Sequence, residues 1–209
     1  MKTRSLAQPK RNNMNIRAIS IYIGYLLLVE GAFMFAALGV AAIYQEQASL
    51  LAFLMTIGVL LFIGLLLTRL RRGPGRVYAR EGFVTVALGW VLISFFGGLP
   101  FYISGYIPNL LDAWFESVSG FTTTGASILK DVEALSQSML YWRSFTHWLG
   151  GMGVLVFMLA VVPLSKGSGE TFHLLRAESP GPSVDKLAPT LRNSAQILYA
   201  IYIVLTIIQ

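Results

Sequence analysis

Long apolar stretches are the feature that most restricts what this chain can fold into. A helix that crosses a bilayer needs about 20 mostly apolar residues. Stretches of about this length are predicted to be spans at Ile19–Ile43, Leu50–Thr68, Phe83–Ile103, Phe145–Leu164 and from Leu191 to Gln209. Because lipid offers the backbone no hydrogen-bond partners, spanning segments of this kind favour helices. The predicted fold class is therefore an all-α membrane protein.

The first apolar stretch is too long for a secretion signal, whose apolar core has about 7–15 residues. Charged residues make up 12% of the 209 residues, about half the share typical of soluble domains, which also favours a membrane protein. The sequence contains no cysteine. That absence excludes disulfide frameworks, thiolate zinc sites and cysteine nucleophiles.

The basic residues set the orientation, because Lys and Arg concentrate in cytoplasmic segments. They gather before the first stretch, between the second and third, and after the fourth, whereas residues 44–47 contain none. These basic residues are Lys2, Arg4, Lys10, Arg11, Arg17, Arg69, Arg71, Arg72, Arg76, Arg80, Lys166, Arg176, Lys186 and Arg192. The N-terminus is thus predicted to be cytoplasmic. The net charge of +6 is explained by these loops, so no nucleic-acid partner is expected.

This orientation makes residues 104–144 external, and they begin with a predicted half-length helix at 107–120. Pro108 and Asn109 favour a helix start, and Asp112 would lie in the first turn, where the helix dipole favours an acid. About a dozen residues at 1.5 Å each reach about halfway through a bilayer. The pattern predicts a re-entrant pore helix between two spans. The alternative is a helix on the membrane surface followed by an external turn.

The polar segment from Thr122 to Gly125 is predicted to be a selectivity filter. Such filters replace the water shell of an ion with backbone carbonyl oxygens. The β-branched side chains of Thr122, Thr123 and Thr124 stiffen an extended backbone, and their hydroxyls are able to tie it to surrounding groups. Gly125 has no Cβ and is free to adopt torsions that other residues avoid. Since the preceding helix would point its partially negative end at this segment, the expected guest is a cation.

Three segments resemble the Trk/Ktr/HKT superfamily of potassium transporters, and the two additional N-terminal spans are similar to those of its TrkH branch. They are FESVSGFTTTGAS at 115–127, WRSFTHWLGGMG at 142–153 and LRAESPGP at 175–182. The resemblance implies four span–pore loop–span units around one pore, with potassium bound at Thr122, Thr123, Thr124 and Gly125.

One such unit is complete here, which predicts three parts of the chain. Residues 1–81 hold the cytoplasmic N-terminus and two extra spans, 82–165 hold the pore-loop unit, and 166–209 hold a cytoplasmic link and the first helix of an incomplete second unit. The chain therefore resembles the N-terminal part of a larger pore-forming subunit, as a fragment or a truncated gene product. Assembly of several copies into a ring is the alternative.

The resemblance also implies the surroundings of the protein. The expected location is a bacterial cytoplasmic membrane, in contact with lipid. Potassium is expected as the transported substrate, with no covalently bound cofactor. A cytoplasmic nucleotide-binding regulatory subunit and a homodimer of the full-length form are the implied protein partners.

Four ionisable residues outside the filter are candidates for a structural or functional role. Glu116, on the predicted pore helix, is expected to support the filter rather than contact the ion. Glu30 interrupts the first span, where an acid is costly, and is expected to be packed against a neighbouring helix. Arg143 and His147 share a helix face and are expected to anchor that helix at the interface. A proton relay through His147 is the alternative.

Small residues and a proline are expected where helices meet closely. Gly97 and Gly98, with Pro100, should bend or end the third span and make room for the pore helix. Gly150, Gly151 and Gly153 should allow close helix packing in the fourth.

Other functions remain open from the sequence. A sodium-permeable transporter differs from a potassium transporter only in filter geometry, and a non-conducting accessory subunit needs no filter at all. An intramembrane enzyme would use Glu30, Glu116 or His147 as acid–base groups. The sequence lacks a convincing nucleophile–base pair or metal cluster, so no enzyme is predicted.

Overall fold

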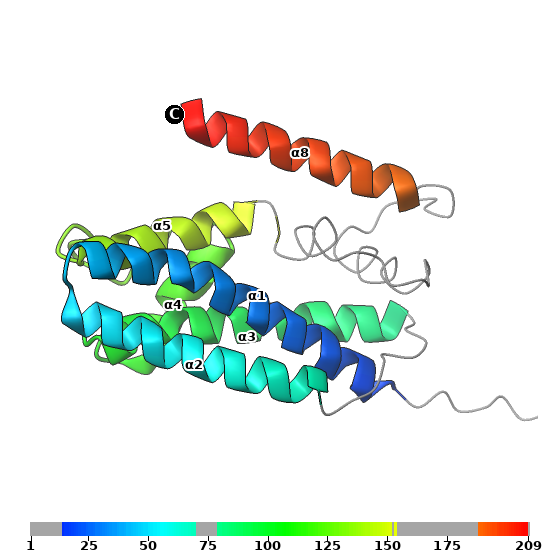
Figure 1. The fold of residues 1–209 in the computed structure, drawn as a ribbon, viewed down its shortest axis with the longest axis horizontal. Coiled ribbons are helices and arrows are strands. Elements are labelled where there is room, and N and C mark those ends of the chain that lie inside the picture. The colour runs from blue at the N-terminus through cyan, green and yellow to red at the C-terminus, as the bar shows by residue number, and fades with distance from the viewer. Residues whose placement is uncertain (1–13, 70–78, 152, 154–187, 209) are drawn as a thin grey trace, which may run out of the picture.

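Every element that the structure describes is a helix, as the all-α prediction requires (Figure 1). The computed structural model describes residues 14–69, 79–151, 153 and 188–208. The helices are α1 (Ile16–Ile43), α2 (Gln47–Arg69), α3 (Ala79–Ile103), α4 (Leu110–Phe121), α5 (Gln137–Gly151) and α8 (Ala188–Ile208). Of these, α1, α2 and α3 from Arg80 onward are long and apolar enough to cross a membrane. The first three predicted spans are confirmed.

Helices α1 and α2 form an antiparallel pair joined by a short turn (Figure 1). The Asn15 side chain caps α1 by accepting a hydrogen bond from Ala18 N at 3.1 Å. Gly24 and Gly64 face each other across the pair, and a Cβ on either would lie 3.0 Å from the carbonyl oxygen of the other. The two backbones therefore approach as closely as glycine allows.

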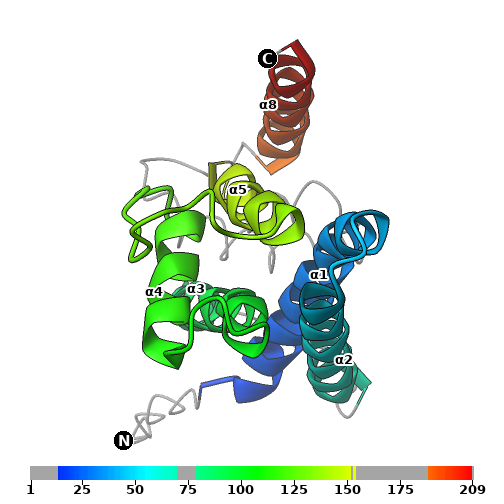
Figure 2. The ribbon, with the colours of Figure 1, turned by 90° about the vertical axis from the view of Figure 1, so that its left-hand side faces the viewer.

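Helix α3 lies between this pair and the short helix α4, and α5 lies beside α4 (Figure 2). The fully buried Trp142 of α5 joins these elements. Its indole Nε1 donates to the Gly97 carbonyl of α3 at 2.9 Å. Its ring also contacts Phe53 of α2 and Phe121 of α4, with centroids 6.3 and 6.5 Å away.

The predicted pore helix at 107–120 exists but begins later, at Leu110. Asn109 precedes it with extended torsions, φ −95° and ψ 125°, and its side chain accepts from Leu111 N at 2.9 Å. Asn109 is therefore the cap rather than part of the helix. With 12 residues, α4 is about 18 Å long, which matches the predicted half-span.

Helix α3 ends at Ile103, as predicted, and Pro100 lies inside its last turn, where a proline removes a single backbone hydrogen bond. One other expectation about helix ends needs correction. The fourth span was predicted to begin at Phe145, but α5 already begins at Gln137. Residues 154–164 of that predicted span lie outside the described residues.

Helix α5 begins early because an acid in the turn between α1 and α2 caps it. The Glu46 carboxylate, in the α1–α2 turn, accepts from Gln137 N at 2.7 Å and from Ser138 N at 3.2 Å. It also accepts from the Ser138 hydroxyl. These are the N–H groups that a helix start leaves without internal partners, so polar residues ahead of the apolar stretch join the helix.

The start of the predicted fifth span lies in α8, which packs on α5. Trp148 and Tyr202 stack with ring centroids 5.4 Å apart. The Tyr202 hydroxyl donates to the Trp148 carbonyl at 3.2 Å, and Trp148 Nε1 donates to the Thr206 hydroxyl at 3.1 Å. A Cβ on Gly151 would lie 2.7 Å from the Tyr202 hydroxyl, so this glycine permits the contact.

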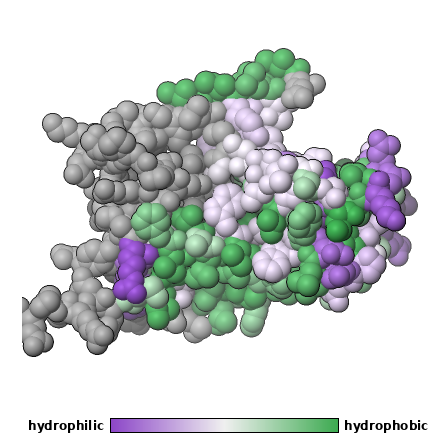
Figure 3. Space-filling model, turned by 180° about the vertical axis from the view of Figure 1, so that it is seen from behind, coloured by the Kyte–Doolittle hydropathy of each residue, from purple (hydrophilic) through white to green (hydrophobic). Residues whose placement is uncertain are grey.

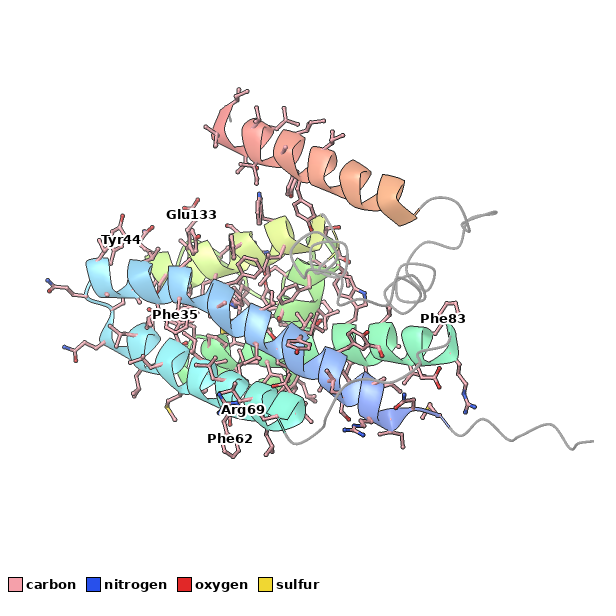
Figure 4. The ribbon with its side chains drawn as sticks, turned by 45° about the vertical axis from the view of Figure 1, so that its right-hand side comes forward. Phe35, Tyr44, Phe62, Arg69, Phe83 and Glu133 are labelled. Carbon is pink, nitrogen blue, oxygen red and sulfur yellow. The ribbon has the colours of Figure 1, made fainter. Side chains whose placement is uncertain are left out.

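The surface has the distribution expected of a membrane protein. A band of apolar side chains covers the visible middle of the bundle, with hydrophilic residues toward its two ends (Figure 3). Tyr44 and Glu133 lie near one end and Phe83 near the other, while Phe62 projects outward from α2 (Figure 4). Phe62 is 70% exposed, which is favourable in lipid and unfavourable in water.

Glu46 should make the fold sensitive to acid. Burial by itself raises the pKa of this carboxyl, but hydrogen bonds from Ser138 and Gln137 outweigh burial and hold the pKa below its usual value. Its stabilisation is thus present above the unfolded pKa, near 4.3, and is lost as the pH falls through the folded value. We predict that Glu46→Ala lowers the free energy of unfolding at pH 7 by about 1 kcal/mol. Denaturant unfolding in mild detergent measures this change.

Glu133→Ala is the matched control, since Glu133 is an exposed acid near the same end of the bundle. We expect no change in unfolding free energy for the control, and a smaller difference between wild type and Glu46→Ala below about pH 4. Equal losses in both variants would contradict the assigned role of Glu46.

Candidate functional site

The candidate site is the segment that follows α4, where the chain turns back on the helix end. The N–H groups of residues 122–124 donate to the carbonyls of residues 118–120 at 2.9–3.0 Å. Thr123 has φ +55° and Gly125 has φ +77°. A β-branched residue rarely adopts positive φ, so the Thr123 backbone is strained. Strain of this kind is concentrated at functional sites.

The threonine hydroxyls bond within this segment and to α4. Thr122 Oγ1 donates to the Val118 carbonyl at 2.8 Å and lies 2.7 Å from Thr124 Oγ1. Thr123 Oγ1 donates to the Thr122 carbonyl at 2.7 Å. The sequence suggested ties to surrounding groups, but in the described chain residues 122–128 are exposed. The hydroxyl contacts are therefore local, to the segment itself and to α4, and the segment remains exposed at the surface of the described chain.

After Gly125 the chain returns alongside α4 and is fastened to it twice. The Ser119 hydroxyl donates to the Ala126 carbonyl at 2.5 Å. The Glu116 carboxylate accepts from the Ser127 hydroxyl and from Ile128 N, both at 3.0 Å. The two ends of the exposed segment are thus held by the same helix.

Glu116 also binds α5 through an ion pair. Arg143 Nε donates to Glu116 Oε1 at 2.6 Å, and the two side chains are 18% and 1% exposed. A carboxylate this deeply buried needs a charged partner and further hydrogen bonds to offset the loss of water, and it has both. Its oxygens are engaged by α5 and by the returning chain, so the position agrees with support of the segment from behind.

Interfacial anchoring by Arg143 stays a prediction, and the structure shows in addition that its guanidinium is paired with Glu116. His147 does lie one turn further on the same face, and its Nδ1 is 2.9 Å from the Arg143 carbonyl oxygen. The ion pair was missed because its partners are 27 residues apart. A signal did exist: a buried acid requires a base, and residues 104–144 contain only Lys130 and Arg143.

Glycines bring α3 and α5 against the two ends of α4. A Cβ on Gly98 would lie 2.7 Å from the Ala113 carbonyl oxygen, near the start of α4. A Cβ on Gly150 would overlap the Phe121 carbonyl at its end, and one on Gly120 would overlap Thr146. The close approach expected at Gly98 and Gly150 is thus observed, and Gly120 adds a further close contact. The predicted filter segment follows directly from a helix end enclosed on two sides.

Glu30 lies apart from this segment. Its side chain is 3% exposed and is buried in the bundle near Gly97 of α3. Among the described residues, no group of three or more His, Cys, Asp or Glu side chains is placed to hold a metal ion.

The Glu116–Arg143 pair leads to a stability prediction. Arg143→Met keeps an unbranched side chain but leaves the Glu116 carboxylate buried without a counter-charge. We expect a loss of about 3 kcal/mol in the free energy of unfolding, measured by denaturation in detergent.

The double variant Arg143→Met/Glu116→Gln removes both charges and should recover part of this loss. The single variant Glu116→Gln completes the comparison. If the loss of unfolding free energy in the double variant equals the sum of the losses in the two single variants, the charges do not interact.

Comparison with known proteins now connects this geometry to a family. Residues 49–209 match the family described as TrkH, cation transport protein. The Trk system potassium uptake protein TrkH of Salmonella typhimurium is 40% identical over 198 residues, which cover 93% of this chain and 40% of that protein. The protein TrkG of the same system in Escherichia coli is 34% identical over 199 residues, covering 94% and 40%.

The fold is also similar to a solved structure. The crystal structure of the potassium transporter TrkH from Vibrio parahaemolyticus superposes with a TM-score of 0.72 and 32% identity, covering 93% of this chain and 38% of that one. These relatives are transport proteins rather than enzymes, and the chain spans about two-fifths of the length of the curated relatives. The chain is a multi-pass membrane protein that belongs to the TrkH family of cation transport proteins.

Proposed function

We propose that this chain contributes one loop of a potassium-selective path, lined by the backbone carbonyl oxygens of Thr122, Thr123, Thr124 and Gly125. One observation carries the proposal. An exposed segment with two positive φ values follows a half-length, partly buried helix and is fastened to that helix at both ends. Its relatives are named for potassium uptake, which favours potassium over sodium as the transported ion.

The end of α4 favours a cation at the segment that follows it. The C-terminal end of a helix carries partial negative charge, and the segment that follows α4 is exposed. A cation that has lost part of its water shell is stabilised at such an end by carbonyl oxygens. Gly125 at φ +77° adopts a backbone conformation that an L-residue reaches only with strain.

Glu116 and Arg143 support this segment in the proposal. The carboxylate oxygens of Glu116 are already engaged by Ser127, Ile128 and Arg143. They are poorly available to a passing ion. Selectivity depends on where carbonyls are held, so the ion pair acts by fixing the returning chain. This role is that of a positioning residue, and the enzyme alternative for Glu116 is not favoured.

A single loop does not surround an ion, so the path requires further polypeptide. We propose that this is supplied by sequence equivalent to the remaining length of the relatives, or by further copies of the chain. Within such a pore, residues 82–165 would form one unit, preceded by the extra spans of residues 1–81 and followed by the link and helix of residues 166–209.

The proposal also includes the setting of the protein. The basic residues favour a cytoplasmic N-terminus, and the relatives favour a bacterial cytoplasmic membrane with lipid around the bundle. A cytoplasmic nucleotide-binding subunit and a homodimer of the longer form are the proposed partners.

Potassium-dependent growth of an uptake-deficient bacterium tests the proposed function. The chain would be expressed as printed and together with its downstream coding sequence, each with and without Gly125→Ser. We expect rescue by the longer form and loss of rescue in its Gly125→Ser variant, because a side chain at φ +77° strains the proposed filter. Expression is verified by immunoblotting of membranes.

Gly105→Ser is the matched control. Gly105 has φ +82°, and a Cβ on either glycine would meet no atom within 4 Å. Both variants therefore carry similar backbone strain, but only Gly125 lies in the proposed filter. Equal loss of growth in both variants would show that backbone strain impairs folding in general, and it would contradict a specific role of Gly125 in the filter. Sodium uptake without potassium uptake would favour the sodium-permeable alternative.

A further inference from the structure

Two buried polar side chains, one on α1 and one on α4, have no hydrogen-bond partner among the described residues. The pair consists of the Glu30 carboxylate of α1 and the Ser117 hydroxyl of α4. Glu30 is 3% exposed and Ser117 is 1% exposed. Leaving a buried polar group unsatisfied is costly, and more so within a membrane. Two such groups in one place therefore require an explanation.

Gly97 of α3 brings the two side chains together. A Cβ on Gly97 would lie 2.7 Å from Ser117 Oγ and 3.3 Å from Glu30 Oε1. The two oxygens are therefore no farther apart than the sum of these distances, yet they make no direct hydrogen bond. Polar atoms separated in this way are commonly bridged by an ordered water, which needs at least two polar partners.

We propose that one internal water molecule bridges the Glu30 carboxyl group and the Ser117 hydroxyl beside Gly97, and that Glu30 is thereby a positioning residue for the pore helix. This inference rests on the proposed function of the segment after α4. The water gives a partner to the Ser117 hydroxyl and to Glu30 Oε1, and it links α1, which lies outside the pore-loop unit, to α4.

The position of Ser117 makes the link relevant to transport. It directly follows Glu116, whose carboxylate holds Ser127 and Ile128 after the filter segment. A shift of α4 at Ser117 therefore displaces the carboxylate that fixes the returning chain. Glu30 acts on the ion path at a distance, through the helix, without contacting the ion.

A double-mutant cycle tests the bridge in the longer form of the protein. Glu30→Leu and Ser117→Ala each break it, so the double variant should lose no more thermal stability than the more damaging single variant. Each should also lower the ratio of potassium to sodium uptake, by at most about fivefold, the factor that the free energy of one hydrogen bond gives if all of it is expressed in selectivity. Additive effects on both readouts would overturn the proposal.

Ser94→Ala is the matched control for the cycle. Ser94 is a buried serine of α3, and its hydroxyl donates to the Trp90 carbonyl of the same helix at 2.7 Å. Its effect should add to that of Glu30→Leu. Non-additivity for this pair as well would show that the cycle reports general loosening of the bundle.

Glu30→Gln separates a water bridge from a bound cation. The amide is able to donate to and accept from a water molecule, so selectivity and stability should stay near those of wild type. If Glu30→Gln is as damaging as Glu30→Leu, the site requires a negative charge and the water bridge is wrong.

Failure of the filter proposal and failure of the water bridge give different results. Wild-type protein that transports no potassium overturns the filter proposal and the role of Glu30 in transport. The thermal cycle then still decides whether Glu30 and Ser117 are coupled.

Discussion

The Glu116 carboxylate is the constraint on which the candidate site depends. It is buried at the middle of a short helix, and it binds the chain that returns from the exposed segment as well as Arg143 of α5. Because a charge in this position requires all of its partners, the segment from Thr122 to Ser127 does not depend on its own contacts alone. The local threonine bonds shape the segment, and the acid determines where it returns.

Close approach of backbones makes that arrangement possible. Gly98 and Gly150 allow α3 and α5 to reach the carbonyls at opposite ends of α4, and Trp142 fills the space where the helices meet. Inside a bilayer, apolar side chains gain little by leaving lipid, so association depends on such packing and on buried polar contacts. The bundle contains both, and they converge on the half-length helix.

The sequence predicted the helices well because length and apolarity alone decide what spans a bilayer. It also predicted the short helix, and it identified Gly125 as a residue that is free to adopt torsions that others avoid. It failed at the start of α5, since Glu46 caps that helix from a distant part of the chain. The Glu116–Arg143 pair was missed for a similar reason, because its partners meet only after the chain has folded. Contacts of this kind depend on tertiary structure, which hydropathy does not encode.

The contact between Glu46 and α5 also has a consequence for biosynthesis. The α1–α2 hairpin leaves the ribosome before α5 is made, so the carboxylate that α5 needs at its start is already available. Gly97 and Gly98 of α3, against which α4 packs, are likewise synthesised before α4. The helices that are synthesised first therefore already present the groups against which α4 and α5 pack.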